Sequence, residues 1–199
     1  MLGLRESEQL WFNLHGDYTY MTEGYYLSLD AEVAGRKVYP STREIMDAYT
    51  APLAAEKAKL GGIPVLEGRI INFPHDVKPP LIAYPVNPFS TGYEIIENKE
   101  EVETKVKRIT MSGKFAAHVQ QLPSNFRIDT VRCIMGRTLV KEYRDFVKRA
   151  FEVFHLPLMK IKTVVTPASY LLSSIEPLLQ EDLTLNEKRI LEGMGVWRE

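Results

Sequence analysis

The sequence feature that most constrains the fold is an amphipathic stretch, residues 138–154, between two apolar runs. Hydrophobic side chains recur along it every three or four residues, and charged side chains fill the opposite side, as on a surface helix. The flanking segments, 126–135 and 158–165, are rich in the residues that favour strands. With a strand at 170–175 and a last helix from Thr184, they predict a C-terminal β-α-β-β-α unit with one right-handed crossover and a hairpin.

The N-terminal quarter indicates further α/β structure. Residues 9–14 read as a short buried strand, and Thr22 is placed to cap the helix that follows. The apolar side of that helix is expected to be Tyr25, Tyr26, Leu29 and Val33, and its C-cap is expected at Gly35. We predict an α/β fold with a mixed β-sheet flanked by helices, α+β being the alternative, in a single domain over residues 1–199.

Two helices and a proline-rich segment come next. Ser41 and Glu44 have the spacing of a capping box, and a third helix is predicted to run to Gly61 with Leu53, Ala54, Ala58 and Leu60 on its apolar side. Six of the twelve prolines lie between residues 64 and 88. Because proline removes a ladder donor, we predict edge strands or extended loop at about 63–98, an insertion-like segment, instead of a central sheet. Residues 99–108 read as a charged, solvated helix or strand face.

Composition excludes several classes of protein. A formal net charge of -1 over 199 residues gives no electrostatic basis for binding nucleic acid. A single cysteine, Cys133, excludes an intrachain disulfide and lies in an apolar run typical of a buried thiol. Neither a signal peptide nor a membrane-spanning segment is present, so we expect a cytoplasmic protein without membrane contact.

The most informative place on the chain is the corner between the first buried strand and its helix. Four of the ten tyrosines fall within residues 18–26, among acidic side chains and one histidine, and such corners bind ligands in open α/β sheets. Gly136-Arg137 forms a second corner, where amides and a guanidinium suit an anion. The candidate ligand-binding residues are therefore Asn13, His15, Asp17, Tyr18, Tyr20, Glu23 and Arg137.

Each of these candidates has a purely structural interpretation as well. Asp17 can make an Asx-turn, Glu23 can favour the helix start, and Arg137 can be a surface arginine. Tyr25 and Tyr26 fit a core or an interface. One histidine with two carboxylates falls short of a metal-binding motif, so we predict no metal site and assign no catalytic residue.

Two blocks of the sequence have a distinctive order of aromatic and small residues. The first consists of Phe12-Asn13-Leu14, Tyr18-Thr19-Tyr20, residues 23–29, Ala31-Glu32, Gly35-Arg36 and Pro40-Ser41. The second consists of Gly136-Arg137, Tyr143, residues 151–154, Pro157-Leu158 and residues 175–178. In these blocks the chain resembles the RimK-like ATP-grasp N-terminal domain family. The resemblance covers about residues 9–50 and 126–195, and residues 63–125 show no recognisable counterpart.

This resemblance implies a role beside ATP-dependent ligation. In the family such a domain normally precedes an ATP-grasp module, which uses ATP and Mg²⁺ to activate a carboxylate and join it to an amine. The sequence ends at Glu199, where that module should begin, and it has no glycine-rich phosphate-binding motif. We therefore expect a non-catalytic, stand-alone module without a cofactor of its own, partnered by a separately encoded ATP-grasp ligase that would supply ATP and Mg.

Two alternatives stay open. The chain could be a self-contained binder of an amino acid or nucleotide, using the corner after Leu14 and Gly136-Arg137. It could also be a small metal-dependent hydrolase using His15, Asp17, Glu23 or His75. A homodimer is a further expectation, because the tyrosine-rich surface and the proline-rich edge need covering if no ligase is present.

Overall fold

The computed structural model describes residues 2–5, 10–75, 77–87, 90 and 92–196. It divides into two compact units, which are described separately. Unit 1 comprises residues 1–49, 130–162 and 175–199, and unit 2 comprises residues 50–129 and 163–174. Strands pair both parallel and antiparallel and alternate with helices, so the predicted mixed α/β class is confirmed. The single-domain expectation stays a prediction.

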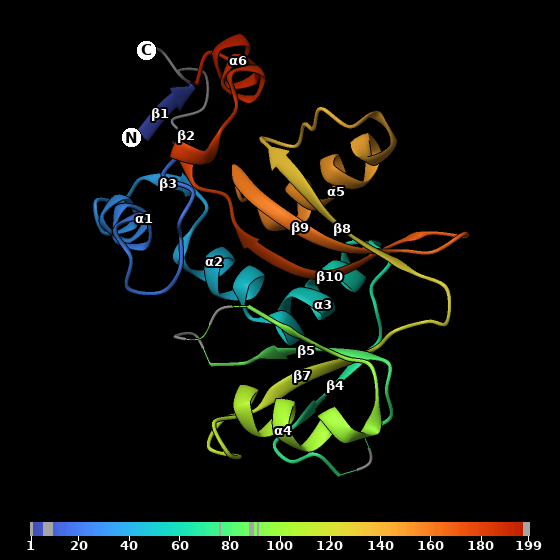
Figure 1. Cartoon of the computed structure of the whole chain (residues 1–199). Helices are drawn as coiled ribbons and strands as arrows, with labels where there is room; N and C mark the ends of the chain where they lie inside the picture. Colours follow the sequence, from blue (N-terminus) through green and yellow to red (C-terminus); the bar gives the residue numbers. More distant parts are fainter. Residues whose placement is uncertain (1, 6–9, 76, 88–89, 91, 197–199) are drawn as a thin grey trace. The chain divides into compact units, whose positions relative to one another are not determined.

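The first sheet of unit 1 contains three short strands in the order β1-β2-β3 (Figure 1). Strand β1 (Leu2–Arg5) is antiparallel to β2 (Leu10–Asn13), which is parallel to β3 (Lys37–Tyr39). Parallel neighbours need a crossover, and helix α1 (Glu23–Val33) supplies it. The predicted strand and the cap at Thr22 are thereby confirmed.

The prediction for the apolar side of α1 was wrong. The buried residues of this helix are Gly24, Ser28 and Ala31, whereas Tyr26 and Val33 are 46% and 80% exposed. Residues at i, i+4 and i+7 share one helix face, and small side chains on that face let the helix backbone approach its neighbours closely. The large side chains of α1 consequently point outward.

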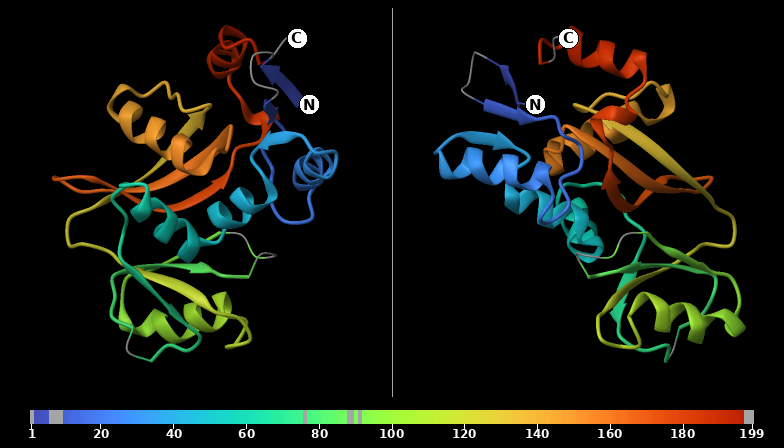
Figure 2. Two further views of the ribbon diagram at one scale, coloured as in Figure 1. Left: turned by 180° about the vertical axis from the view of Figure 1, so that it is seen from behind. Right: turned by 60° about the vertical axis from the view of Figure 1, so that its left-hand side comes forward.

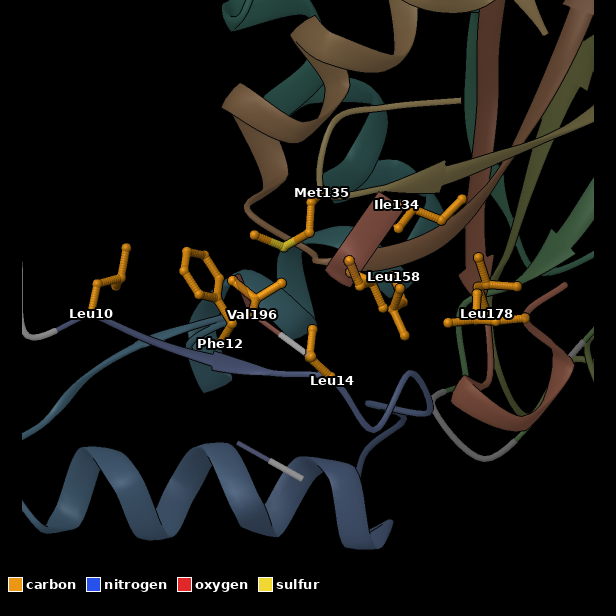
Figure 3. Packing of buried hydrophobic residues seen from close by; sticks show 10 residues of the cluster. Leu10, Phe12, Leu14, Ile134, Met135, Leu158, Leu178 and Val196 are labelled. Atoms are coloured by element: carbon orange, nitrogen blue, oxygen red, sulfur yellow. The ribbon is translucent and has the colours of Figure 1, made fainter. Parts of the chain in front are cut away.

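The hydrophobic core of unit 1 joins residues far apart in the sequence (Figure 3). Side chains from β2 and the loop after it meet side chains from the C-terminal third of the chain. The buried members are Leu10, Phe12, Leu14, Ile134, Met135, Leu158, Leu178, Leu183, Leu191 and Val196. Burying a large apolar side chain stabilises by about 1.5–3 kcal/mol, so this cluster holds the two ends of the chain in one unit.

The C-terminal elements follow the predicted β-α-β-β-α order. Strands β8 (Arg127–Ile134), β9 (Leu158–Val165) and β10 (Tyr170–Pro177) form a sheet in the order β10-β9-β8. Helix α5 (Arg144–Phe154), after a 3-10 turn η1 (Lys141–Tyr143), lies between β8 and β9, and α6 (Leu185–Gly193) follows a second 3-10 turn η2 (Gln180–Asp182). The helix predicted from residue 138 begins only at Arg144, and Leu139, which was expected on its apolar side, is exposed.

Unit 2 is built on a four-stranded sheet, β4-β7-β5-β6, with helix α4 (Lys99–Ile109) packed on one face (Figure 2). The strands are β4 (Gly68–Ile71), β5 (Leu81–Pro85), β6 (Glu94–Ile96) and β7 (Ala117–Gln121). The proline-rich segment was predicted to lack a central strand, and this was wrong for β5, which pairs with both β6 and β7. Its prolines lie at or before its ends, so Leu81–Tyr84 keep every ladder donor.

The remaining helices are α2 (Thr42–Tyr49) in unit 1 and α3 (Ala51–Leu60) in unit 2. The apolar side of α3 is formed by alanines 51, 54, 55 and 58, whereas Leu53 and Leu60 are exposed, contrary to prediction. No helix in the described part of the chain is both long and apolar enough to cross a bilayer.

The capping box that starts α2 also anchors α5. The Ser41 amide and hydroxyl both donate to Glu44 Oε2, at 2.8 and 2.9 Å, and Glu44 Oε1 lies 2.6 Å from His155 Nδ1. His155 caps α5 and stacks on Tyr39 with ring centroids 4.3 Å apart. Burial opposes ionisation of Glu44, but the hydrogen bonds from His155 and Ser41 outweigh it and lower the pKa of this carboxyl.

We predict that Glu44→Gln destabilises the protein at pH 7 by about 1 kcal/mol, because charge-assisted bonds become neutral ones. A carboxyl with a lowered folded-state pKa stabilises above its unfolded pKa, and the contribution is lost as pH falls through the folded pKa. The gap between wild type and variant, measured by urea unfolding, should therefore shrink between about pH 5 and pH 3. The exposed Glu192→Gln serves as control, and a gap that stays constant with pH would contradict the assignment.

Candidate functional site

The corner between β2 and α1 is held by one buried amide side chain, that of Asn13. Its Nδ2 donates to the Gly24 carbonyl at 2.6 Å and to Ser28 Oγ at 2.9 Å, and its Oδ1 accepts from the His15 amide at 3.1 Å. Asn13 is fully buried, so these bonds are made away from water, where an unmade bond is costly. Asn13 thereby ties the end of the strand to the first two turns of the helix.

Tyr18 is a second buried side chain that holds this corner together. Its side chain is fully buried, its hydroxyl donates to the Asn13 carbonyl at 2.7 Å, and burial raises the pKa of its phenol far above the usual value. A phenol that is buried and bonded in this way is a structural group. Binding of a ligand by Tyr18, one of the candidate residues, would require this packing to break.

Two glycines allow the corner to be this tight. Gly16 has φ +87°, and a Cβ there would lie 2.0 Å from the Leu178 carbonyl oxygen. A Cβ at Gly24 would lie 1.9 Å from the Asp17 carbonyl oxygen. Both positions exclude any side chain, so the backbone of the loop is in direct contact with α1 and with the segment after β10.

The remaining candidates at the corner face outward. The Asp17 carboxylate accepts from the Thr19 amide at 3.0 Å, which is the predicted Asx-turn. His15 Nε2 lies 3.7 Å from the carboxylate of Glu23, whose side chain is 79% exposed, while His15 Nδ1 is buried without a hydrogen-bond partner among the described residues. Tyr20 is 39% exposed and packs edge-to-face on Tyr25 at 5.2 Å. Together His15, Tyr20 and Glu23 form the accessible part of the corner.

Arg137 belongs to a different feature. Its backbone amide and carbonyl pair with those of Ile134 at 2.9 and 2.8 Å, closing a tight turn after β8, and its side chain is exposed. The predicted strand-to-helix corner is therefore a hairpin-like turn in front of η1. A ligand-binding role for the seven candidate residues stays a prediction.

The third alternative, a metal-dependent hydrolase, requires side chains that can bind a metal ion together. Within it, no three His, Cys, Asp or Glu side chains are grouped so that they could hold a metal ion. His75 is exposed, and Asp76 beside it lies outside the described residues. Cys133 is buried as predicted, and burial raises the pKa of its thiol to about 12.

Sequence reasoning missed an open groove in unit 2 of about 420 Å³. Residues from β4, β5 and β7 and the loop before β5 line it: Glu67, Gly68, Arg69, Val77, Lys78, Leu81, Val119, Gln120 and Gln121. The groove carries two basic side chains and one acidic side chain on an apolar floor. Because residues 63–98 were predicted to be edge strands or loop, nothing in the sequence indicated that these side chains lie close together.

Asn13 gives the corner a testable anchor. We predict that Asn13→Ala lowers the free energy of unfolding by about 1–3 kcal/mol, because it leaves buried partners of the amide unsatisfied. Asn186→Ala, on the exposed surface of α6, should change it by less than about 0.5 kcal/mol. Urea unfolding followed by tryptophan fluorescence measures both, and equal stabilities of the two variants would contradict the bracing role of Asn13.

Comparison with known proteins places this geometry in a family. The model of the RimK-like ATP-grasp N-terminal domain matches residues 4–193, including residues 63–125, for which the sequence alone suggested no counterpart. None of the curated proteins matches the chain.

Solved structures with a similar fold include an ATP-grasp protein and two ligases. The RimK domain ATP-grasp protein of Sphaerobacter thermophilus has a TM-score of 0.62 at 16% identity, over 88% of this chain and 73% of that one. The D-alanine–D-alanine ligase of Helicobacter pylori has a TM-score of 0.63 at 15% identity, over 94% and 72%. The ATP-grasp ligase PsnB in complex with its precursor peptide has a TM-score of 0.53 at 18% identity, over 83% and 61%.

At these identities the solved structures show a shared fold, and the family model establishes membership. The match spans nearly the whole chain, and both sequence blocks that carried the resemblance lie within it. The chain belongs to the RimK-like ATP-grasp N-terminal domain family.

Proposed function

We propose that this chain is a non-catalytic module that acts beside a separately encoded ATP-grasp ligase and shapes the acceptor side of a shared site. The observation that carries the proposal is membership of a ligase-associated family, by a match over residues 4–193, in a chain whose buried charges are already paired. ATP and Mg²⁺ would enter only through the partner ligase.

The charges inside the two units support a non-catalytic role. Of the buried side chains that the structure describes, only Lys162 and Glu187 carry a charge at neutral pH, since burial lowers the pKa of His118 to about 4. Lys162 Nζ lies 3.2 Å from Glu176 Oε1, and Arg132 donates two bonds to Glu187 at 2.7 and 2.8 Å. Phosphate transfer needs cations and magnesium ligands directed at substrate, whereas these groups neutralise one another.

A polar network in unit 2 is closed in the same way. Ser173 Oγ lies 2.7 Å from the Tyr84 hydroxyl and donates to Gln120 Oε1 at 2.5 Å, and Gln120 Nε2 donates to the Ser173 carbonyl at 3.0 Å. All three side chains are buried and neutral. A satisfied network of this kind rigidifies a core instead of binding a ligand.

The ligase hypothesis predicts a complex. Mixed with an ATP-grasp ligase from the same genome, the chain should bind with a dissociation constant of about 1 µM or tighter and raise the rate of ADP release with the carboxylate and amine substrates. Tyr20→Ala should weaken the complex, because Tyr20 is the exposed aromatic of the corner. Tyr93→Ala, equally 39% exposed but in unit 2, is the matched control.

Light scattering measures the formation of the complex, and a coupled enzyme assay measures the rate of ADP release. The absence of any complex at about 50 µM of each protein would overturn the proposal, because a dissociation constant of about 1 µM would leave most of both proteins bound at that concentration. ADP release by the chain alone, with a carboxylate and an amine, would overturn it as well.

The groove in unit 2 favours a second candidate function, a self-contained binder of an amino acid or nucleotide. Its volume lies within the range of small-molecule sites, and Arg69 and Lys78 suit a carboxylate or phosphate. For this candidate the ligand site lies in unit 2, whereas the sequence predicted it at the corner after Leu14 and Gly136-Arg137.

Thermal unfolding separates the second candidate from the first. A ligand present at about 100 times its dissociation constant stabilises by about 2.7 kcal/mol, a rise of several degrees in Tm for a chain of this size. Among amino acids and nucleotides tested on the chain alone, one should produce this rise in wild type and in Lys99→Ala but not in Lys78→Ala. No shift with any of them, or an equal shift in Lys78→Ala, excludes the groove.

A further inference from the structure

The groove of unit 2 combines an apolar floor with positively charged side chains. Val77, Leu81 and Val119 form the floor, and Arg69 and Lys78 supply the cations. We propose that the groove binds a carboxylate that carries an aliphatic chain, the chemistry shared by leucine and by isocaproate, which is leucine without its amino group. The inference rests on the second candidate function, a small-molecule binder in unit 2, and narrows the ligand of that site.

The strand register places the Arg69 side chain on the same face of the sheet as the floor. Residues directly opposite each other in antiparallel strands direct their side chains to one face. Arg69 lies opposite Val119. Leu81 lies opposite Gln121, and Leu81 and Val119 both belong to the apolar cluster that includes side chains of α4. The guanidinium group and the floor are therefore on the α4 side of the sheet.

The floor is continuous with the hydrophobic core of unit 2. Val77, Leu81 and Val119 are buried and belong to one cluster with Val102 and Val106 of α4. An aliphatic chain that lies along the groove would extend this cluster and would itself be removed from water. The floor thus favours a ligand with an apolar part.

The charge of the groove favours an anion. Glu67 is the only carboxylate among the described residues that line it, and its Oε2 lies 3.2 Å from Lys59 Nζ on α3. Lys59 also pairs with Glu56, so these residues with Arg69 and Lys78 make three cations against two carboxylates. A carboxylate is therefore attracted to the groove, and a guanidinium can bond both of its oxygens.

The same lining disfavours a nucleotide. None of the described residues that line the groove is aromatic, so a base has no ring on which to stack. The Gln120 side chain is bonded to Ser173, and Gln121 Nε2 donates to the Pro80 carbonyl at 2.7 Å. The two side-chain amides that could recognise the edge of a base thus already have partners within unit 2.

Thermal unfolding of the chain with four small probes tests the proposal. At about 20 mM and pH 7, isocaproate should raise Tm by several degrees, as expected for a dissociation constant of about 1 mM. Acetate lacks the chain and isocaproamide lacks the charge, so each should bind at least about tenfold more weakly. Leucine distinguishes the source of the ligand: binding equal to that of isocaproate indicates an amino acid, and weaker binding indicates a simple acid.

Two lysine variants locate the bound probe. Lys78→Ala should weaken the binding of isocaproate at least about fivefold, whereas Lys99→Ala, at the exposed start of α4, should leave it unchanged. Equal binding by the two variants overturns the proposal, and so does acetate or isocaproamide that binds as tightly as isocaproate.

A nucleotide separates failure of this inference from failure of the function on which it rests. If AMP raises Tm in wild type but not in Lys78→Ala, while isocaproate and leucine have no effect, the inference is overturned and the second candidate function stands. If none of these compounds raises Tm, both are overturned.

Discussion

The interaction on which unit 1 depends is the set of hydrogen bonds around the Asn13 side chain. A strand of only four residues cannot fix the direction of the helix that follows it, and the apolar contacts of Phe12 and Leu14 are non-directional. The amide of Asn13 supplies direction, since it reaches the Gly24 carbonyl, Ser28 Oγ and the His15 amide at once. The route of the chain from β2 into α1 follows from those three bonds.

The close approach of the α1 backbone to its neighbours at this corner determines which side chains of the helix lie at the surface. Because Gly24 and Ser28 face inward, the helix has no room for its large side chains on that side, and Tyr26 and Val33 are turned to the surface. One local choice of small residues therefore explains both the tight corner and the exposure of these two side chains. The outward position of Tyr26, one of the aromatic residues that carry the family resemblance, follows from this inward packing requirement.

Local signals in the sequence predicted the structure well, whereas signals that depend on tertiary context did not. The caps at Thr22 and at Ser41 with Glu44 and the start of the last helix at Thr184 were correct, because each involves groups within three residues. The apolar faces of α1 and α3 were wrong, because hydrophobic periodicity assumes that large side chains turn inward. Strand β5 was misread because its prolines border the ladder without interrupting it. The groove of unit 2 joins residues 67 to 121 and has no local signal at all.

The described buried charges of unit 1 are paired with one another. Arg132 on β8 donates two hydrogen bonds to the carboxylate of Glu187 on α6. The same carboxylate accepts two more from the amide and hydroxyl of Thr184, which caps α6. Burial opposes ionisation of Glu187, but these four hydrogen bonds outweigh it and lower the pKa of the carboxyl. Removing one partner of such a pair leaves the other as a buried, uncompensated charge, which is strongly destabilising. Arg132 and Glu187 are thereby committed to the stability of unit 1, in which the positions of β8 and α6 depend on each other.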